Sequence, residues 1–313
     1  MTRSFTLVTG GAGGIGIHLV RDLARRGIPV RVLDNFSSGT RGNLALLQQL
    51  EGVEIVEGDV KDAATVNRAL EGVDFVWHLS ANPDIRKGTV ETDLDLNEGP
   101  VATRTLLQGM RTKGVHSLAF SSSSVVYGFP KVFPTPEDYG PLLPESLYGA
   151  SKLACEGLLS SFAHTFGMRA WIFRFANIVG PGATHGVMYD FVQKLRKDPT
   201  RLEVLGDGRQ SKGYLWVTDC VAAMVHCTER SQDTVNVFNL APGDRISVAE
   251  IAQVVVDAFG GRARIEYTGG SKGWAGDIPQ QLLAIGKLQA TGFRNQYTSR
   301  QAVEMQVRAF LEG

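Results

Sequence analysis

The sequence predicts an α/β protein, in which a Rossmann-type doubly wound parallel sheet is joined to a smaller α+β lobe. Two observations favour this fold class. Short apolar runs of strand length alternate with amphipathic, helix-length segments through the first half of the chain, which is typical of successive βαβ units. A glycine-rich turn also follows the first apolar run and leads into the first helix-length segment, as the first βα turn of such a sheet requires.

Length and charge set the broad class. The chain has 313 residues, 43% of them hydrophobic, with 32 basic and 32 acidic residues and a formal net charge of +0. A chain of this length can bury a large core and is expected to divide into two lobes. The balanced charge predicts no partner that is a nucleic acid or an anionic membrane surface, and the longest apolar runs fall far short of the roughly 18 residues of a membrane span.

Targeting signals and cysteines indicate the compartment. The first residues lead directly into a strand-like run without a leader pattern. Cys155, Cys220 and Cys227 are odd in number and lack metal-ligand spacing, so they are expected to be reduced packing residues. We therefore expect a cytoplasmic protein that binds no metal ion.

The first strand, turn and helix predict a phosphate-binding unit. Phe5 to Val8 is expected to be a buried strand, and the turn from Thr9 to Gly16 precedes a helix that ends near Arg26. Glycines allow the tight turn and the close approach of a pyrophosphate, whose charge is stabilised by the helix N-terminus. Two registers fit this motif, Gly11 or Gly10 combined with Gly13 and Gly16.

Asp34 predicts the kind of dinucleotide. It ends the second strand, 29–33, about 20 residues after the glycines. A carboxylate at this position accepts hydrogen bonds from the adenosine ribose hydroxyls and repels a 2′-phosphate, which favours NAD over NADP. The alternative is that Asp34 only caps a turn or a helix.

Further strands and helices continue the alternation. The expected strands are 53–56, 74–79, 116–121, 170–175, 202–205, 214–217 and 235–240, and the expected helices are 63–70, 95–112, 148–166, 189–197, 219–228, 247–259 and 299–311. Small or polar residues follow three of the strands, at Asp59-Val60, Leu79 to Asn82 and Ser121 to Ser124. Since the carboxyl ends of parallel strands meet at one edge, these residues are expected near a bound cofactor. His78 and His116 are expected to be structural.

Tyr148 and Lys152 predict acid/base chemistry. A helix places residues i and i+4 on one face, and an ammonium about 5 Å from a phenol favours the phenolate by roughly two pKa units. Tyr148 could then take a proton from a substrate hydroxyl. The same spacing is also common on solvated helix faces, so it requires support from the rest of the chain.

The segment after the 170–175 strand breaks the regular pattern and predicts a domain boundary. The NAD-binding domain is expected to cover 1–178 and to be rejoined by about 213–240. A substrate-binding lobe is expected from 179–212 and 241–313. Within that lobe, Ser247 and Glu250 have the spacing of a helix capping box.

Taken together, these motifs resemble those of the extended short-chain dehydrogenase/reductases, specifically the nucleotide-sugar epimerases of the UDP-glucose 4-epimerase type. The resemblance covers essentially the whole chain, and several motifs in the right order are far more specific than any one of them. They are Thr9 to Gly16, Asp34-Asn35, Asp59-Val60, His78 to Ala81, Ser122 to Gly128, Tyr148 to Lys152, Arg174 to Asn177, and Gly206 to Gln210.

The resemblance implies NAD-dependent 4-epimerisation of a nucleotide sugar, most simply a UDP-hexose such as UDP-glucose or UDP-galactose, through a transient 4-keto sugar. Ser123 would orient the substrate hydroxyl, Tyr148 would be the acid/base, and Lys152 would hold the nicotinamide ribose and tune Tyr148. The implied NAD contacts are Gly10, Gly13, Ile15, Gly16, Asp34, Asn35, Asp59, Val60, Leu79, Ala81, Asn97, Ser121, Tyr148, Lys152 and Phe175. The implied substrate contacts are Ser123, Ser124, Tyr148, Asn177 and Lys212.

The chain lacks catalytic residues that similar enzymes use for other reactions. Ser124 and Val125 stand where sugar-nucleotide 4,6-dehydratases carry an Asp-Glu pair. Val125 also replaces the Glu of uronate decarboxylases and the Cys of 3,5-epimerases and fucose-synthase-type enzymes. Oxidation and reduction at C4 remain, which predicts 4-epimerisation. The alternatives are an NAD-dependent nucleotide-sugar dehydrogenase or ketoreductase, and a non-catalytic nucleotide-sensing protein.

Three positions depart from the family pattern. Gly14 stands where a Phe is usual, and Lys212 and Trp274 stand where diphosphate-binding Arg residues are usual. An ammonium can pair with phosphate but lacks the bidentate fork of a guanidinium. These changes bear on the nucleotide and the sugar rather than on the fold or the cofactor.

The resemblance further implies a homodimer in which the 95–112 helix and the Tyr148 helix of each subunit pack together. Such a contact requires apolar outer faces. Leu106, Met110, Leu159 and Phe162 are the residues expected to supply them.

Overall fold

The computed structural model describes residues 4–39, 41–85, 87–183, 185–270 and 280–312. The chain forms two compact units. The first unit consists of Met1–Gly128, Gly140–Arg174 and Met224–Phe238, and the second of Phe129–Tyr139, Phe175–Ala223 and Asn239–Gly313. Trp274, one of the three positions that depart from the family pattern, lies outside the described residues.

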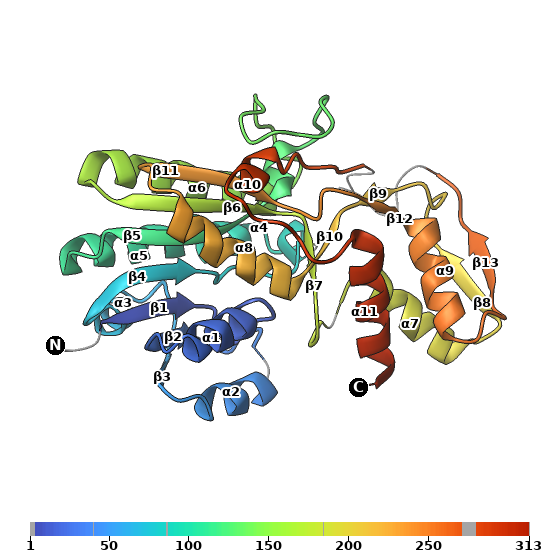
Figure 1. Ribbon diagram of the computed structural model, residues 1–313, viewed down its shortest axis with the longest axis horizontal. Coiled ribbons are helices and arrows are strands. Elements are labelled where there is room, and N and C mark those ends of the chain that lie inside the picture. The colour runs from blue at the N-terminus through green and yellow to red at the C-terminus, as the bar shows by residue number, and fades with distance from the viewer. Residues whose placement is uncertain (1–3, 40, 86, 184, 271–279, 313) are drawn as a thin grey trace. The chain divides into compact units, whose positions relative to one another are not determined.

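A seven-stranded sheet with the order β11-β6-β5-β4-β1-β2-β3 forms the centre of the first unit (Figure 1). The pairs β1–β2, β1–β4, β2–β3 and β4–β5 are parallel. The strand order reverses between β1 and β4, so the predicted doubly wound, Rossmann-type sheet is confirmed and its switch point lies beside the end of β1. The strands are β1 (Phe5–Thr9), β2 (Val30–Asp34), β3 (Val53–Glu57), β4 (Val73–His78), β5 (Ser117–Ser123), β6 (Arg169–Phe175) and β11 (Val235–Leu240).

Helices cover both faces of this sheet (Figure 1). In the view of Figure 1, α1 lies in front of the strands, whereas α3, α5 and α6 lie behind them and pack against one another in sequence order. Their buried side chains form one apolar core with those of the strands, because each helix has one apolar face. The helices are α1 (Gly16–Arg25), α2 (Arg41–Gln48), α3 (Ala63–Ala69), α5 (Ala102–Lys113), α6 (Leu147–Phe166) and α8 (Val217–Arg230), the last of which begins in the second unit.

The helix expected at 95–112 is interrupted. It consists of α4 (Thr92–Leu96), a π-helical turn over Asn97–Val101, and α5. Pro100 lies inside the π turn, and a proline cannot donate the i→i−4 hydrogen bond that a regular α-helix needs there. The turn buries Gly99 against α6, where a Cβ atom would lie 1.9 Å from Ser151 Oγ.

Three of the four residues expected in a dimer contact are core residues instead. Leu106 and Met110 are 0% exposed and Leu159 is 1% exposed, and all three belong to the core beneath the sheet. The prediction for them is wrong, because the apolar stripes of α5 and α6 face the strands rather than solvent. Phe162 is partly buried against the same core.

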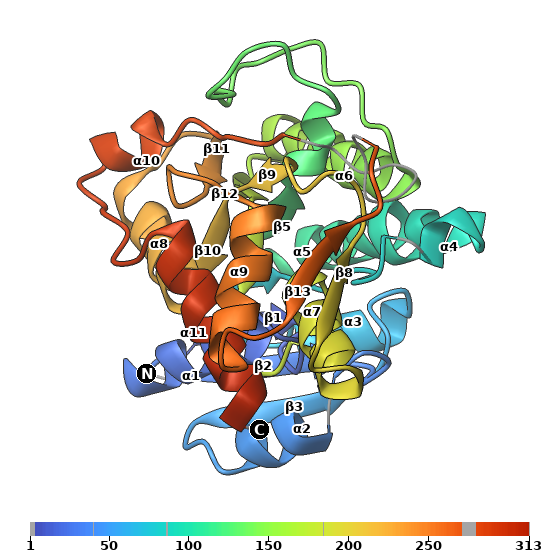
Figure 2. The ribbon, with the colours of Figure 1, turned by 90° about the vertical axis from the view of Figure 1, so that its right-hand side faces the viewer.

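The second unit contains small sheets flanked by helices (Figure 2). α7, α9 and α11 pack against one another, and β8 pairs in parallel with β13. Ser247 and Glu250 form the predicted capping box at the start of α9. The elements are β7 (Asn177–Val179), α7 (Val187–Lys197), β8 (Arg201–Val204), β9 (Ser211–Lys212), β10 (Tyr214–Trp216), β12 (Ile246–Ser247), α9 (Val248–Ala258), β13 (Arg264–Tyr267), α10 (Gly286–Ala290) and α11 (Ser299–Glu312).

Within the described ranges, no helix combines the length and the apolar character that crossing a bilayer requires.

Candidate active site

The glycine turn between β1 and α1 is packed too tightly for a side chain at Gly10 or Gly16. Gly10 has a φ of +70°, and a Cβ atom on it would lie 2.8 Å from the backbone nitrogen of Ser80. A Cβ on Gly16 would lie 2.1 Å from the Gly10 carbonyl oxygen and 2.7 Å from Gly11 Cα, so both registers stay open. α1 has no acidic residue in its first turn and Ile15 provides no side-chain cap. Its first N–H groups therefore suit a pyrophosphate.

Two positions in this turn behave differently. Gly11 packs on the sheet, where a Cβ atom would lie 2.7 Å from Val32 Cγ1. Gly14 is exposed and has no atom within 4 Å of an added Cβ. The turn therefore does not require glycine at position 14, and the departure from the family pattern there leaves the phosphate cradle intact.

Asp34 has the turn-capping role that the sequence left open as the alternative. Its Oδ2 accepts a hydrogen bond of 2.9 Å from the Ala12 N–H, and its Oδ1 accepts one of 2.8 Å from the Phe36 N–H. The carboxylate thus braces the glycine turn. A carboxylate has about four lone-pair sites, so each oxygen can also accept a ribose hydroxyl.

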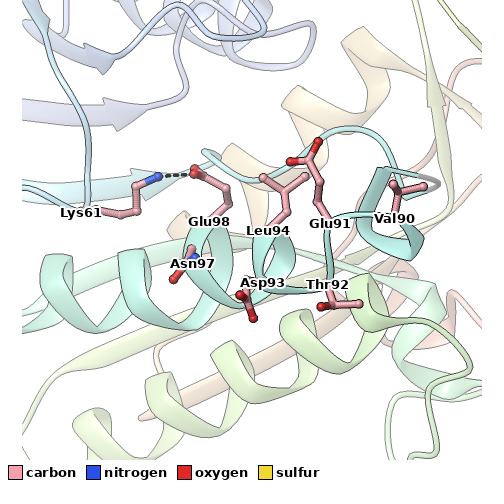
Figure 3. A pocket seen from close by; sticks show the side chains of 8 residues that line it. All are labelled: Lys61, Val90, Glu91, Thr92, Asp93, Leu94, Asn97 and Glu98. Atoms are coloured by element: carbon pink, nitrogen blue, oxygen red, sulfur yellow. Dashed lines mark hydrogen bonds and ion pairs between the residues drawn. The ribbon is translucent and has the colours of Figure 1, made fainter.

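Asp59, Asn35 and Lys61 form a polar group beside the ends of β2 and β3. Asn35 Nδ2 donates to Asp59 Oδ2 at 3.2 Å, and Lys61 Nζ lies 3.3 Å from the same oxygen. Lys61 also forms an ion pair with Glu98 (Figure 3). Val60 is buried between them in the chain. An adenine base bound here would lie beside the side chains of Asn35, Asp59 and Lys61.

Asn97 lies exposed on the π turn, away from the face that packs on α6. It lines a hollow of about 570 Å³ together with Lys61, Glu98 and five residues of the segment 90–94 (Figure 3). The residue of this turn that is buried against α6 is Gly99. A contact of Asn97 with NAD stays a prediction.

His78 is a structural histidine, as expected. It is 0% exposed at the end of β4. Its Nδ1 lies 2.8 Å from Thr9 Oγ1 and its Nε2 lies 3.0 Å from Thr103 Oγ1. Desolvation, followed by the nearby charge of Lys152, lowers the pKa of His78 to about 3, so the ring is neutral. The His78 ring links β1, β4 and α5. Leu79 and Ala81, which follow the end of β4, are half-buried.

The hydroxyl run after β5 meets α6. Ser121 and Ser122 are buried, and Ser123 is partly exposed. Ser123 Oγ accepts from the Val125 N–H at 3.4 Å and caps a 3₁₀ turn, Ser124–Tyr127. Ser124 is buried within that turn, so its hydroxyl is less available to a substrate than that of Ser123.

Tyr148 and Lys152 lie on the face of α6 that meets β5. Lys152 is 3% exposed, and its Nζ donates a 2.6 Å hydrogen bond to the Ser121 carbonyl. The same Nζ lies 4.7 Å from the Phe120 ring centroid and 5.7 Å from that of Tyr148. Ser146 Oγ caps the helix by accepting from the Gly149 N–H at 3.0 Å. The structure thus brings Lys152 to Ser121 and Tyr148, and Ser123 follows Ser121 by two residues at the end of β5.

The pKa values of this pair correct one expectation. Desolvation raises the pKa of the Tyr148 phenol well above its usual 10, and the nearby Asp95 carboxylate and Cys155 thiol raise it further. The expectation that Lys152 lowers this pKa within the protein itself is wrong, because desolvation outweighs the ammonium at this distance. Desolvation also lowers the pKa of Lys152 to about 8, against the attraction of Cys155, Glu156 and Asp95.

Three charged residues that were not predicted as site residues, Asp95, Glu156 and Arg174, lie next to this pair, although Arg174 belongs to one of the sequence motifs. Asp95 is 2% exposed, its Oδ1 accepts from Asn82 Nδ2 at 2.9 Å, and its carbonyl accepts from Ser151 Oγ at 2.7 Å. Glu156 and Arg174 form a buried ion pair at 2.7 Å. Glu156 could have been found from its position, since it follows Tyr148 and Lys152 at the same four-residue spacing.

Phe175, Asn177 and Lys212 belong to the second unit. Phe175 is 7% exposed. Asn177 begins β7, and its Nδ2 donates to the Gly213 carbonyl at 3.3 Å. Lys212 lies in β9 and pairs with Ile246 of β12. Their predicted contacts with cofactor and substrate stay predictions.

The buried charge of Lys152 predicts a dependence of stability on pH. Because the folded pKa of about 8 lies below the unfolded value of about 10.5, the unfolded state binds more protons between these values and stability rises with pH. Relative to Lys152→Met, the wild-type free energy of unfolding should increase by about 3 kcal/mol between pH 7 and pH 10.5 in urea titrations.

Lys61→Met serves as the control of opposite sign. Desolvation opposes the charge of Lys61, but its ion pairs with Glu98 and Asp59 raise its pKa, so wild-type stability relative to this variant should fall as pH rises. A wild-type to Lys152→Met difference that does not change with pH would contradict the burial of a charged Lys152.

Comparisons with known proteins identify the family of this chain. The model of the NAD dependent epimerase/dehydratase family matches residues 6–241. A UDP-glucose 4-epimerase from Mycolicibacterium smegmatis is 31% identical over 84% of this chain and 85% of its own, and UDP-glucuronic acid decarboxylase 1 from Arabidopsis thaliana is 33% identical over 83% and 60%. The crystal structure of a UDP-galactose 4-epimerase is 38% identical, covers 98% of this chain and 99% of its own, and has a TM-score of 0.87. The chain therefore belongs to the NAD-dependent epimerase/dehydratase family.

Proposed function

We propose that the protein is an NAD-dependent nucleotide-sugar 4-epimerase acting on a UDP-hexose such as UDP-glucose or UDP-galactose. The observation that carries the proposal is the group formed by Ser123, Tyr148 and Lys152 where β5 meets α6. Lys152 is fixed there by the Ser121 carbonyl, and Ser123 is fixed by its place as the cap of the 3₁₀ turn. Relatives named as UDP-glucose and UDP-galactose 4-epimerases support the same assignment.

The glycine turn, the uncapped start of α1 and the Asp34 carboxylate fit NAD. Gly10 and Gly16 allow the tight turn at the start of α1, where a pyrophosphate would bind, and Asp34 disfavours the 2′-phosphate of NADP by charge repulsion. NAD⁺ supplies a hydride acceptor and a positive charge when it is bound. Lys152 would hold the nicotinamide ribose.

Tyr148 would exchange the proton of the sugar C4 hydroxyl. Its raised pKa keeps the phenol protonated in the protein alone, so it becomes a base only where added positive charge lowers that pKa. Tyr148 then accepts the hydroxyl proton as hydride leaves C4, and Ser123 donates a hydrogen bond to the same oxygen. The 4-keto sugar would then rotate within the site so that the opposite face of C4 is presented. Tyr148 would return the proton while hydride adds to that face.

Val125 and Ser124 favour this outcome over elimination or decarboxylation. Val125 follows Ser123 closely in the 3₁₀ turn and is apolar, and Ser124 is buried. Neither side chain can protonate a leaving hydroxyl at neutral pH. A net dehydrogenase or ketoreductase is the second candidate, because the same three residues serve both reactions. A nucleotide-sensing protein without turnover is less well supported, since Tyr148 and Lys152 are both present.

In the second unit, we propose that Asn177 and Lys212 contact the nucleotide sugar. Lys212 would provide a single charged contact to the diphosphate in place of an arginine fork. Cys155, Cys220 and Cys227 are all buried and form no disulfide, which supports a reducing compartment, and we propose a cytoplasmic location.

The function is tested with a panel of UDP-glucose, UDP-galactose, UDP-N-acetylglucosamine and UDP-glucuronate. The wild-type protein should convert at least one of them to its C4 epimer, and Tyr148→Phe should reduce kcat by about 10²–10⁴-fold while NAD binding is kept. Tyr267→Phe, at a residue 46% exposed in the second unit, is the matched control and should be neutral. Products altered only at C3, C5 or C6 would refute epimerisation at C4, and stoichiometric NADH would favour the second candidate.

We further propose a homodimer that forms through the outer face of α6. This face carries exposed Leu147, Ala150, Ala154 and Gly157, whereas Lys152 and Glu156 are buried. From 147 to 157 the exposed positions of α6 carry no acidic or basic side chain, which is unusual unless a partner covers them. A second copy of the chain fits because self-association through one such face gives a closed twofold dimer.

Light scattering at micromolar concentration tests this dimer. The mass should be twice the 33.9 kDa of the chain, and Ala154→Arg should yield a folded monomer because it places a charge in the contact. Ala45→Arg, at an exposed position of α2, should leave the dimer intact. A wild-type mass near that of one chain would contradict the proposal.

A further inference from the structure

A buried ion pair lies directly behind the residues proposed to act on the substrate. Glu156 is 6% exposed and Arg174 is 5% exposed. Arg174 Nε lies 3.0 Å from Glu156 Oε1, and Arg174 Nη2 lies 2.7 Å from Glu156 Oε2. This two-point arrangement fixes the relative orientation of both side chains.

The pair also binds the two segments that surround Ser123. On one side, Ser122 Oγ donates a 2.5 Å hydrogen bond to Glu156 Oε1. On the other, Arg174 Nη1 donates a 3.0 Å hydrogen bond to the Tyr127 hydroxyl, and the guanidinium carbon lies 4.8 Å from the Tyr127 ring centroid. Ser123 therefore lies between two anchored residues, at the end of β5 and the end of the 3₁₀ turn.

On α6, Glu156 continues the face of Tyr148 and Lys152. The three residues follow one another at intervals of four, which is about one helical turn each. Lys152 is tied to the Ser121 carbonyl and Glu156 to the Ser122 hydroxyl. Consecutive residues of β5 thus bind consecutive turns of α6. These two contacts fix the position of the helix along the direction of the strand.

Stability alone does not explain this arrangement. Taking two charges out of water is costly, and replacing a buried ion pair by apolar residues of similar volume is often neutral or stabilising. An apolar pair makes no directed hydrogen bonds, so it cannot fix the position of a helix along a strand in this way. Misplacing a catalytic group by about 1 Å can reduce a rate about 10²-fold.

We propose that Glu156 and Arg174 are positioning residues, which hold β5 and α6 at the register where Ser123, Tyr148 and Lys152 act on one substrate carbon. The proposal rests on the proposed epimerase function. It adds that the ion pair sets the rate of the chemical step rather than the binding of the sugar.

The decisive variant is the double replacement Glu156→Leu with Arg174→Met, which removes both charges and most of the directed bonds but keeps apolar volume. Its melting temperature should remain within a few degrees of the wild type, and its KM within about threefold. Its kcat should fall at least tenfold. NAD affinity, measured without sugar by the shift in melting temperature, should fall at least fivefold, because Lys152 moves with α6.

A matched control is the double replacement Arg31→Met with Glu54→Leu. These residues form a 2.9 Å ion pair between β2 and β3, and Arg31 also donates to the Ala69 and Glu71 carbonyls. This pair has no contact with α6 or β5 among the described interactions. The control should keep the wild-type kcat and NAD affinity.

Two smaller changes keep the test decisive if the double variant does not fold. Ser122→Ala and Tyr127→Phe each remove one hydroxyl from the network, and each should lower kcat about three- to tenfold at unchanged KM. A third variant, Glu156→Asp, keeps the charge but shortens the side chain. Its melting temperature should lie closer to that of the wild type than its kcat does. Wild-type kcat in the folded double variant, or in both single variants, would overturn the proposal.

The proposed function can fail independently. If the wild type turns over no nucleotide sugar, the function is refuted, and the NAD affinities of the wild type, double variant and control still decide the positioning role. Equal affinities in all three would then overturn it.

Discussion

The burial of the Lys152 ammonium is the interaction on which the site depends. A charge this far from water is costly, and desolvation lowers its pKa to about 8. The charge is retained because Lys152 Nζ donates a 2.6 Å hydrogen bond to the Ser121 carbonyl and lies 4.7 Å from the Phe120 ring centroid. Both partners come from β5, so the charge ties α6 to the edge of the sheet at which a parallel fold presents its ligands.

The same burial sets the condition under which Tyr148 can act. Removing water from the phenol raises its pKa, and Asp95 and Cys155 add to this effect. One ammonium 5.7 Å from the ring centroid does not reverse it. A base that is inactive until a cationic cofactor is bound would restrict proton removal to complexes in which hydride can also be transferred.

Much of the fold follows from local sequence signals. The glycine turn could be predicted because it depends on residues close in the sequence, such as Gly10 and Gly16. Asp34 could be predicted from its place at the end of the second strand, although its contact with the Ala12 N–H joins residues 22 positions apart. The Ser121 to Ser123 run and the Tyr148/Lys152 pair could be placed because strand ends and helical spacing locate them. The segment Phe129–Tyr139, which reads only as a proline-rich loop, belongs to the second unit.

What could not be predicted depends on contacts between distant segments. Leu106 and Leu159 have an apolar character that suits a core as well as an interface, and only the packing of α5 and α6 on the sheet decides between them. The π turn at Pro100 buries Gly99 against Ser151, a contact between residues 52 positions apart. The pairing of Glu156 with Arg174, and the sign of the Tyr148 pKa shift, likewise depend on burial that the sequence does not display.

The central claim is that hydride leaves C4 of the sugar and returns to the same carbon while Tyr148 exchanges the hydroxyl proton. The direct measurement uses the UDP-hexose that the panel identifies, carrying deuterium at C4, in ordinary water, with mass and NMR analysis of the epimer. The account predicts that deuterium remains at C4 of the product and that no NADH accumulates. Loss of the deuterium to solvent, or its transfer to free NADH, would contradict it.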